Sequence, residues 1–244
     1  MYNRSATIYD AIYRSQGKDY AAEAQKICAL IEQHKLSNGK SLLDVACGTG
    51  DHLAYLQQDF NVEGLDNSKE MLDVAHNKFP DLHFHLADMV DFDIDRSFDV
   101  ITCLFSAIGY VQTLPRLNQA MRTIAKHLRP GGMTIIEPWF GPGDLDVGKV
   151  HAAFVDEPGL KIARMNINRV EGKMSYLDFH YMVGMPAGIE YFTETHAIGL
   201  FSHEEYLQAV QDAGLKVVHD KEGLDGRGLY IGVKQRVFDD SNSI

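Results

Sequence analysis

Apolar positions over the first 137 residues alternate between helical spacing and short continuous runs. The segment from Tyr20 to about Gln33 carries apolar residues on one helical face, and Asn38-Gly39 ends this pattern. The run Phe98–Phe105 is almost wholly apolar, which is typical of a parallel strand covered on both faces. By the same criteria, further strands are predicted at Ser41–Ala46, Asn61–Asp66, Leu82–Leu86 and Met133–Glu137, and further helices at Asp51–Gln58, Lys69–Lys78 and Leu117–His127. Such alternation predicts an α/β fold with a doubly wound, mostly parallel sheet.

The pattern changes after Trp139. From about Lys161 to Leu200 helical periodicity disappears, and β-rich stretches are separated by the turn signals Glu171-Gly172 and Met185-Pro186-Ala187-Gly188. We therefore predict an antiparallel β meander inserted into the α/β unit at about residues 150–200.

Helical spacing returns after the predicted insertion. Ser202 and Glu205 have the spacing of a capping box, and Gly214 stands where a left-handed residue would end the helix. Two further apolar runs, Leu215–His219 and Leu229–Lys234, bring the predicted sheet to seven strands.

Charge and length limit what the chain can bind. Lys and Arg total 23 and Asp and Glu 34, a formal net charge of −11 over 244 residues. Because like charges repel, this balance disfavours nucleic acid and anionic membranes as partners and leaves small molecules. A chain of this length with an α/β pattern is expected to form one domain, residues 1–244, that carries the insertion.

The N-terminal segment and the cysteines bear on location. Met1–Thr7 lacks the apolar core of a signal peptide, and no apolar run approaches the roughly 18 residues of a membrane span. Cys28, Cys47 and Cys103 are odd in number and have no metal-ligand spacing. We expect a cytoplasmic protein with no bound metal.

A turn rich in small residues follows the first predicted strand. Asp44 closes the strand, and Ala46, Gly48 and Gly50 allow a ligand to approach the backbone before the next helix begins. A dinucleotide fingerprint would place a third glycine where this chain has Leu53. The turn therefore predicts a ligand held without a pyrophosphate contact.

The next two strands also end in acidic residues. Asp66 is placed to accept both hydroxyls of a ribose, and Asp88 to accept the amine of an adenine. Met89 adds a backbone N–H and an apolar contact. Together these strand ends indicate a nucleoside without phosphates, although either aspartate alone could be a turn residue.

These motifs resemble those of class I S-adenosylmethionine (SAM)-dependent methyltransferases. Leu42–Gly50 is similar to their first motif, Asp66 to the ribose-binding acid, Asp88-Met89 to the adenine pair, and Leu128–Gly132 to the loop before strand five. The resemblance implies a Rossmann-like fold with SAM as cofactor. The expected cofactor-binding residues are Tyr9, Tyr20, Asp44, Ala46, Gly48, Gly50, Asp66, Asn67, Met71, Asp88, Met89 and Leu104.

A narrower resemblance covers nearly the whole chain. Five stretches, namely 8–10, 17–20, 104–110, 137–139 and 226–229, resemble the N,N-dimethyltransferases that act on nucleotide-linked 3-amino-3,6-dideoxyhexoses in macrolide deoxysugar biosynthesis. This implies a dTDP-amino sugar as substrate and two methyl transfers, with the β insertion as active-site roof and dimer contact. It also implies that Tyr9 and Tyr20, together with Tyr2, close over the cofactor. Tyr2, Trp139 and Arg227 are the expected substrate-binding residues, and the forked cation of Arg227 suits a diphosphate.

Methyl transfer from a sulfonium depends mainly on holding the nucleophile in line, so a strong dedicated base is unnecessary. We expect Tyr9 and Tyr110 to orient the amine, and Glu137 or His180 to relay a proton. The family carries histidine where this chain has Tyr110. Tyr110 could equally be a structural hydrogen-bond donor, and His180 and His196 could be structural residues of the insertion.

Tyr110 in place of histidine keeps open a methyltransferase for another small amine, amino acid or hydroxyl. A third hypothesis, of a different class, is a non-catalytic SAM-binding module. A nucleic-acid methyltransferase is disfavoured, because the sequence has neither a basic face nor an N-P-P-Y-type catalytic run.

Overall fold

The computed structural model describes residues 4–236 and confirms the expected doubly wound sheet. Its seven strands lie in the order β10-β11-β5-β4-β1-β2-β3, and β10 and β11 form the antiparallel edge. The strands are β1 Ser41–Val45, β2 Asn61–Asp66, β3 His83–Leu86, β4 Phe98–Cys103, β5 Leu128–Ile136, β10 Leu215–Asp220 and β11 Leu229–Lys234. The parallel strands β1 to β5 therefore place their carboxyl ends along one edge.

Two layers of helices cover the sheet because successive strand residues face opposite sides. In β1, Leu42 packs with α2 (Tyr20–His34), α3 (Leu53–Leu56) and α4 (Lys69–Lys78), while Leu43 packs with α5 (Leu114–His127) and α6 (His203–Asp212). The predicted capping box at the start of α6 is present. Within residues 4–236, no helix is long and apolar enough to cross a membrane.

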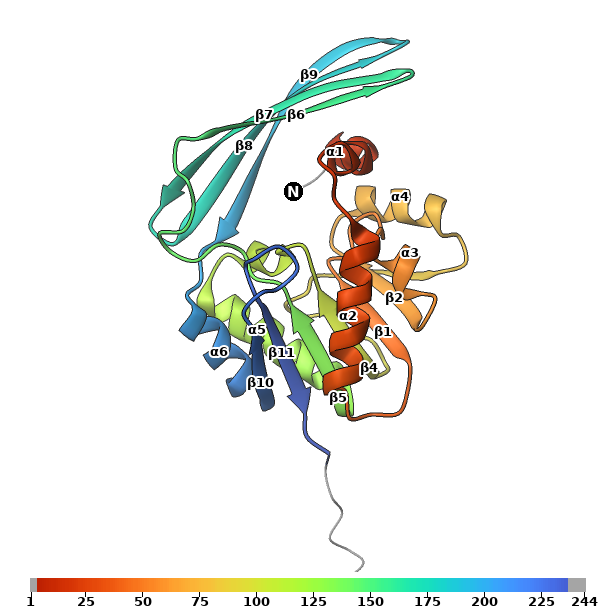
Figure 1. The fold of residues 1–244 in the computed structure, drawn as a ribbon, viewed down its shortest axis with the longest axis vertical. Helices are drawn as coiled ribbons and strands as arrows, with labels where there is room; N and C mark the ends of the chain where they lie inside the picture. Colours follow the sequence, from red (N-terminus) through yellow and green to blue (C-terminus); the bar gives the residue numbers. More distant parts are fainter. Residues whose placement is uncertain (1–3, 237–244) are drawn as a thin grey trace, which may run out of the picture.

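The meander forms a separate four-stranded antiparallel sheet of β6 Val150–Glu157, β7 Leu160–Glu171, β8 Met174–Met185 and β9 Gly188–Gly199. It arches over the carboxyl edge of the main sheet (Figure 1). Two N-terminal helices that the sequence pattern did not predict, η1 (Arg4–Ile8) and α1 (Tyr9–Ser15), pack Ile8, Ala11 and Ile12 against its inner face. Asp10 on α1 accepts hydrogen bonds from Thr49 and Lys78, which tie these helices to the loop after β1 and to the end of α4.

Two predicted boundaries are wrong. The helix expected at Asp51–Gln58 is only α3, because turns lead into it from the glycine loop and out of it toward β2. The turn expected at Arg129–Gly132 belongs to β5, because Leu128 already pairs with Phe98 and a register shift absorbs the extra residues.

Candidate active site

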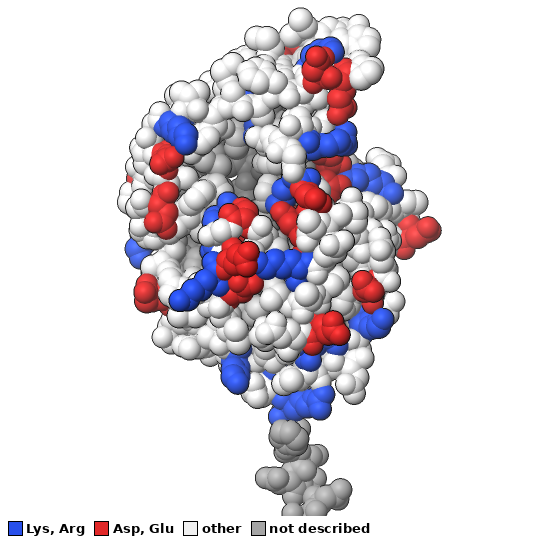
Figure 2. All heavy atoms as spheres, in the orientation of Figure 1, with Lys and Arg blue, Asp and Glu red and all other residues white. Residues whose placement is uncertain are grey.

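A cavity of about 510 Å³ lies between the carboxyl edge of the parallel strands and the inner face of the meander. Figure 2 shows the surface hollowed between these two parts, with charged side chains along its rim. Its walls come from segments far apart in the chain, from Tyr9 on α1 through Asp66 at the end of β2 to Arg227 before β11. The strand edge and the meander therefore share one space.

The loop after β1 meets Asp66 at one end of this cavity. Ala46 and Gly48 have φ angles of +58° and +55°, and the Gly48 N–H donates to Asp66 Oδ2 at 2.9 Å. Ser68 N–H donates to the other carboxylate oxygen at 2.8 Å. A carboxylate accepts about four hydrogen bonds, so it keeps acceptor capacity for a ligand. Burial raises the pKa of Asp66, and the backbone N–H groups oppose that rise.

Eight of the twelve predicted cofactor residues lie on the cavity wall, two line a recess beside it, and two line neither. Tyr9, Ala46, Gly48, Asp66, Asn67, Met71, Met89 and Leu104 line the cavity. Gly50 does not, because its φ of +81° turns it toward the Phe79 ring, 3.2 Å from where a Cβ would stand. Asp88 also stays out of the wall, and its carboxylate pairs with Arg116 at 2.9 Å and accepts from Val90 N–H.

A smaller recess of about 40 Å³ adjoins the cavity and is lined by Tyr9, Tyr20 and Asp44. Asp44 is 2% exposed and accepts a hydrogen bond from Thr102 Oγ1 at 2.7 Å. Burial raises the pKa of its carboxyl to about 6. The Tyr20 hydroxyl is buried there with no hydrogen-bond partner among the described residues. The recess therefore presents an acid and a hydroxyl that a polar ligand could satisfy.

The raised pKa of Asp44 predicts an unusual effect on stability. Between about pH 4 and 6 the folded chain binds a proton that the unfolded chain has released, so stability decreases as the pH rises through this window. Asp44→Asn removes the buried charge and keeps an oxygen for Thr102. We expect it to stabilise the ligand-free protein by about 1–2 kcal/mol at pH 7.5, within the roughly 3 kcal/mol that such a shift represents. Thermal unfolding at pH 7.5 and 4 tests this, since the gain should disappear at pH 4.

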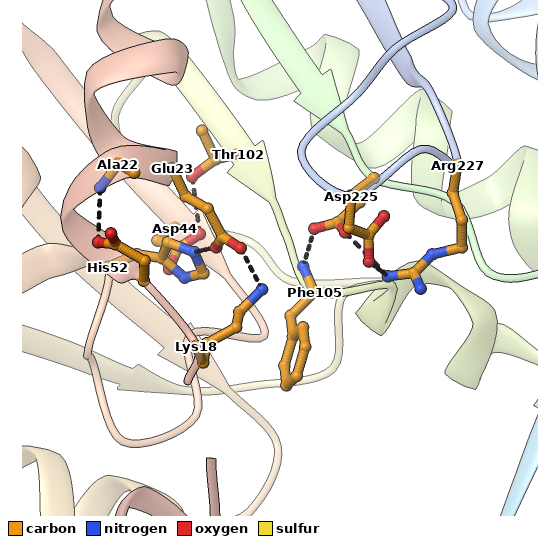
Figure 3. Close-up of polar contacts among 11 residues, drawn as sticks. Lys18, Ala22, Glu23, Asp44, His52, Thr102, Phe105, Asp225 and Arg227 are labelled. Atoms are coloured by element: carbon orange, nitrogen blue, oxygen red, sulfur yellow. Dashed lines mark hydrogen bonds and ion pairs between the residues drawn. The ribbon is translucent and has the colours of Figure 1, made fainter. Parts of the chain in front are cut away.

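A charged network stands beside this recess (Figure 3). Glu23 on α2 accepts from Lys18 and from His52 Nε2, the latter at 2.8 Å. Burial would raise the pKa of Glu23, but these hydrogen bonds outweigh it and lower the pKa. The Lys18 ammonium lies 4.2 Å from the centre of the Phe105 ring. Sequence reasoning had singled out the stretch 17–20 but assigned Lys18 no part.

Arg227 and Asp225 lie on the other side of Phe105 (Figure 3), and Arg227 links Asp225 to Glu137 in a second network. Glu137 follows β5, is fully buried, accepts from the Phe105 N–H and pairs with Arg227 Nη2 at 3.0 Å. Burial raises the pKa of Glu137 and Arg227 opposes the rise. Asp225 also contacts Arg227, so two carboxylates compensate this cation. Arg227 lines the cavity, whereas Glu137 lies behind the wall.

The roof contains a polar stripe that sequence reasoning missed. Arg164, Asn166 and Asn168 alternate along β7, are 6–7% exposed and line the cavity, while Met165 and Ile167 between them are 47% and 50% exposed. Arg164 donates to Gln16, and its Nε has no partner among residues 4–236. From Arg164 to Asn168, the polar side chains of β7 face the cavity and the apolar ones face outward. This reversal of the usual alternation is the sequence signal that could have identified the polar stripe.

The remaining predicted residues separate into three groups. Tyr110 and Trp139 line the cavity. His180 is exposed on the outer face of β8, where its Nδ1 contacts the Tyr191 hydroxyl at 2.6 Å, so it cannot reach the cavity and the proton-relay prediction for it is wrong. Tyr2 lies outside the described residues.

One further cluster lies away from the cavity. Glu63, His83 and His85 place potential ligand atoms within 4.8 Å of one another at the β2–β3 edge. Sequence spacing missed this group because Glu63 comes from a neighbouring strand. The Glu63 carboxylate already contacts Arg96 and His85 Nε2, the latter at 2.8 Å. These contacts form an ion-pair network.

Comparison with known proteins identifies the family to which this chain belongs. Residues 42–132 match the model of a methyltransferase domain. The chain is 40% identical over 230 residues to dTDP-3-amino-3,4,6-trideoxy-alpha-D-glucopyranose N,N-dimethyltransferase of Streptomyces venezuelae, covering 93% of this chain and 97% of that one. The chain belongs to the family of sugar N,N-dimethyltransferases. It is thus a SAM-dependent methyltransferase, and the resemblance noted from its motifs is confirmed.

Solved structures of this family share the whole architecture. The Streptomyces venezuelae protein DesVI matches with a TM-score of 0.89 at 39% identity, over 96% of this chain and 99% of that one. SAM-bound CalS10, an amino pentose methyltransferase from Micromonospora echinaspora involved in calicheamicin biosynthesis, matches with a TM-score of 0.84 at 34% identity, over 93% and 97%. The β meander is therefore part of the family fold.

Proposed function

We propose that this chain transfers two methyl groups from SAM to the amino group of a dTDP-linked amino deoxysugar. One observation carries the proposal. A single cavity joins a nucleoside-binding strand edge to a polar roof, with Tyr110 lining the space that they share. A site for a simple amine would not need a buried arginine and two buried asparagines above it.

The strand edge suits SAM in its chemistry. Asp66 has acceptor capacity for the ribose hydroxyls, and Met71 and Met89 offer apolar contacts to an adenine. Asp44 and the Tyr20 hydroxyl stand where they could receive the polar methionine end. When bound there, SAM supplies an electrophilic methyl group on a positively charged sulfur, and the electron-rich face of Tyr9 favours that charge.

The roof suits a nucleotide sugar. Arg164 keeps an unpartnered Nε in a buried position, while two carboxylates already compensate Arg227. We therefore assign the main diphosphate contact to Arg164 and a supporting contact to Arg227. Trp139 lies beneath the Arg227 guanidinium, 5.8 Å from it, and gives the sugar an apolar wall.

Product analysis tests this function. Purified protein is incubated with SAM and a panel of dTDP-amino sugars that differ in the position of the amine, beside simple amines and the matching dTDP-hydroxy sugars. Mass spectrometry should find dimethylated dTDP-amino sugar and unchanged hydroxy sugar. Transfer only to simple amines, or to the hydroxyl compounds, would contradict the proposal.

We also propose a homodimer formed through the outer face of the meander. Phe154, Met182 and Tyr191 lie in register across this sheet and are 63%, 55% and 60% exposed, and Ile189 beside them is 77% exposed. Contiguous apolar surface of this kind marks protein interfaces.

The free cysteines among the described residues fit a reducing compartment, and we propose a cytoplasmic location.

A charge placed in this patch should break the dimer. Met182→Asp should convert a dimeric wild type to monomer in analytical ultracentrifugation, because an unpaired carboxylate would be buried at the interface. Leu86→Asp, at an exposed apolar position on the edge of the main sheet, is the matched control and should remain dimeric. A monomeric wild type would end the proposal.

A further inference from the structure

Tyr110 contacts a buried histidine that neither its sequence position nor the family resemblance pointed to. Its hydroxyl lies 2.6 Å from His196 Nδ1, although the residues are 86 positions apart. Tyr110 belongs to the short helix η2 (Ala107–Val111) and lines the cavity, whereas His196 on β9 is fully buried behind it. The Tyr110 hydroxyl thus lies between the His196 imidazole and the cavity.

The strand pattern of β9 aligns an acid with this histidine. Phe192, Glu194, His196 and Ile198 all face inward, because side chains alternate along a strand. Glu194 Oε2 lies 3.8 Å from His196 Nε2, and the same carboxylate accepts from the backbone N–H groups of Arg4 and Ser5. A carboxylate facing Nε2 favours the tautomer with its proton on Nε2. His196 Nδ1 is then an acceptor, and the Tyr110 hydroxyl donates to it.

The surroundings keep this imidazole neutral before substrate binds. Burial lowers the pKa of His196, Glu194 raises it and Arg164 lowers it. Glu194 on β9, Arg164 on β7 and the Tyr110 hydroxyl on η2 act on the ring. Phe179 on β8 packs against it edge-on. A neutral imidazole that acts as acceptor can take up a proton.

We propose that Tyr110 and His196 form a proton relay that removes a proton from the substrate ammonium before each methyl transfer. This inference rests on the proposed function. An amino sugar arrives largely as an ammonium ion, which has no lone pair for attack. Its N–H proton passes to Tyr110 Oη while the Tyr110 hydroxyl proton passes to His196 Nδ1, giving an imidazolium that faces Glu194. Tyr110 ends the step with its hydroxyl intact.

The neutral amine can then react. Its lone pair forms the new C–N bond as the methyl–sulfur bond breaks, and the electrons of that bond remain on sulfur. The product is again an ammonium ion, so a second transfer requires the relay once more, after His196 has returned its proton to solvent. His196 acts through Tyr110 and is a positioning residue, while Tyr110 touches the substrate. Tyr110, with the His196 imidazole behind it, stands where the resemblance implies a histidine.

Kinetics with three variants test the relay. Tyr110→Phe, His196→Gln and the double variant should each lose about 10- to 100-fold in kcat near pH 7, at the lower end of what general-base catalysis contributes, with the KM for SAM unchanged. The loss should shrink toward pH 9, where the substrate amine is already neutral. Because the two residues act as one unit, the double variant should be no slower than the worse single variant.

A matched control and an independent readout complete the design. His203→Gln removes another histidine–tyrosine contact, 2.8 Å to the Tyr230 hydroxyl outside the cavity wall, and should keep wild-type kcat. Circular dichroism and affinity for S-adenosylhomocysteine verify folding. Nitrogen-15 NMR of the imidazoles should show His196 with its proton on Nε2, and with a changed Nδ1 resonance in Tyr110→Phe.

The outcomes are distinct. A loss of kcat that is the same at every pH, additive effects in the double variant, or a proton on Nδ1 would overturn the relay. If the wild type methylates none of the amino sugars, the proposed function fails, and the NMR tautomer still decides whether Tyr110 donates to His196.

Discussion

Asp66→Asn should weaken the binding of S-adenosylhomocysteine by about 100-fold in isothermal titration calorimetry. The Asp66 carboxylate already accepts from Gly48 and Ser68 N–H groups and keeps acceptor capacity for the two ribose hydroxyls. Two hydrogen bonds to a charged group contribute about 1.5–3 kcal/mol each, and about 1.4 kcal/mol corresponds to a tenfold change in affinity. The amide keeps only one acceptor oxygen, so most of this contribution is lost.

A matched variant separates this effect from a general loss of negative charge. Asp73→Asn removes an exposed carboxylate on α4 that pairs with Lys69, and it should bind like the wild type. Because burial raises the pKa of Asp66, wild-type affinity should begin to decline at a higher pH than an ordinary aspartate would require. Unchanged affinity in Asp66→Asn would show that the ribose lies elsewhere.

Arg164→Met should raise the KM for the dTDP-amino sugar by about 10- to 100-fold and leave the KM for SAM unchanged. Arg164 is 7% exposed, and its Nε lacks a protein partner, so a diphosphate could take a charge-assisted hydrogen bond there. Methionine retains much of the packing on Tyr13 and Phe179 that the guanidinium now provides. Initial-rate kinetics with each substrate varied in turn separates the two constants.

Arg169→Met provides the control for this prediction. Arg169 lies on the same strand but faces outward, where it pairs with Asp178 and Glu171. Its removal should change neither KM. A KM for the sugar that stays at the wild-type value in Arg164→Met, or an equal rise in the KM for SAM, would contradict the assignment of the diphosphate to the roof.

The sequence predicted the part of the site that depends on local order. Parallel strands bring their carboxyl ends to one edge, so strand-end residues such as Asp66 and Met89 could be placed from the chain alone. Asp88 also follows its strand, but its pairing with Arg116, 28 residues away, could not be inferred from spacing.

Residues of the meander were harder to place because their roles depend on which face is covered. Strand alternation could have excluded His180, since its neighbours Phe179 and Tyr181 are apolar and buried. The same alternation, inverted in β7, could have indicated Arg164. The contact of Tyr110 with His196 joins η2 to β9, and only tertiary packing brings them together.

We propose that one cavity holds SAM at the strand edge and a dTDP-amino sugar beneath the meander. A crystal structure of the protein with S-adenosylhomocysteine and a dTDP-amino sugar tests this arrangement. We predict the ribose on Asp66, the diphosphate on Arg164 with Arg227 nearby, and the sugar nitrogen within hydrogen-bond distance of Tyr110. A nucleotide bound away from the roof, or a sugar nitrogen out of reach of Tyr110, would contradict this account.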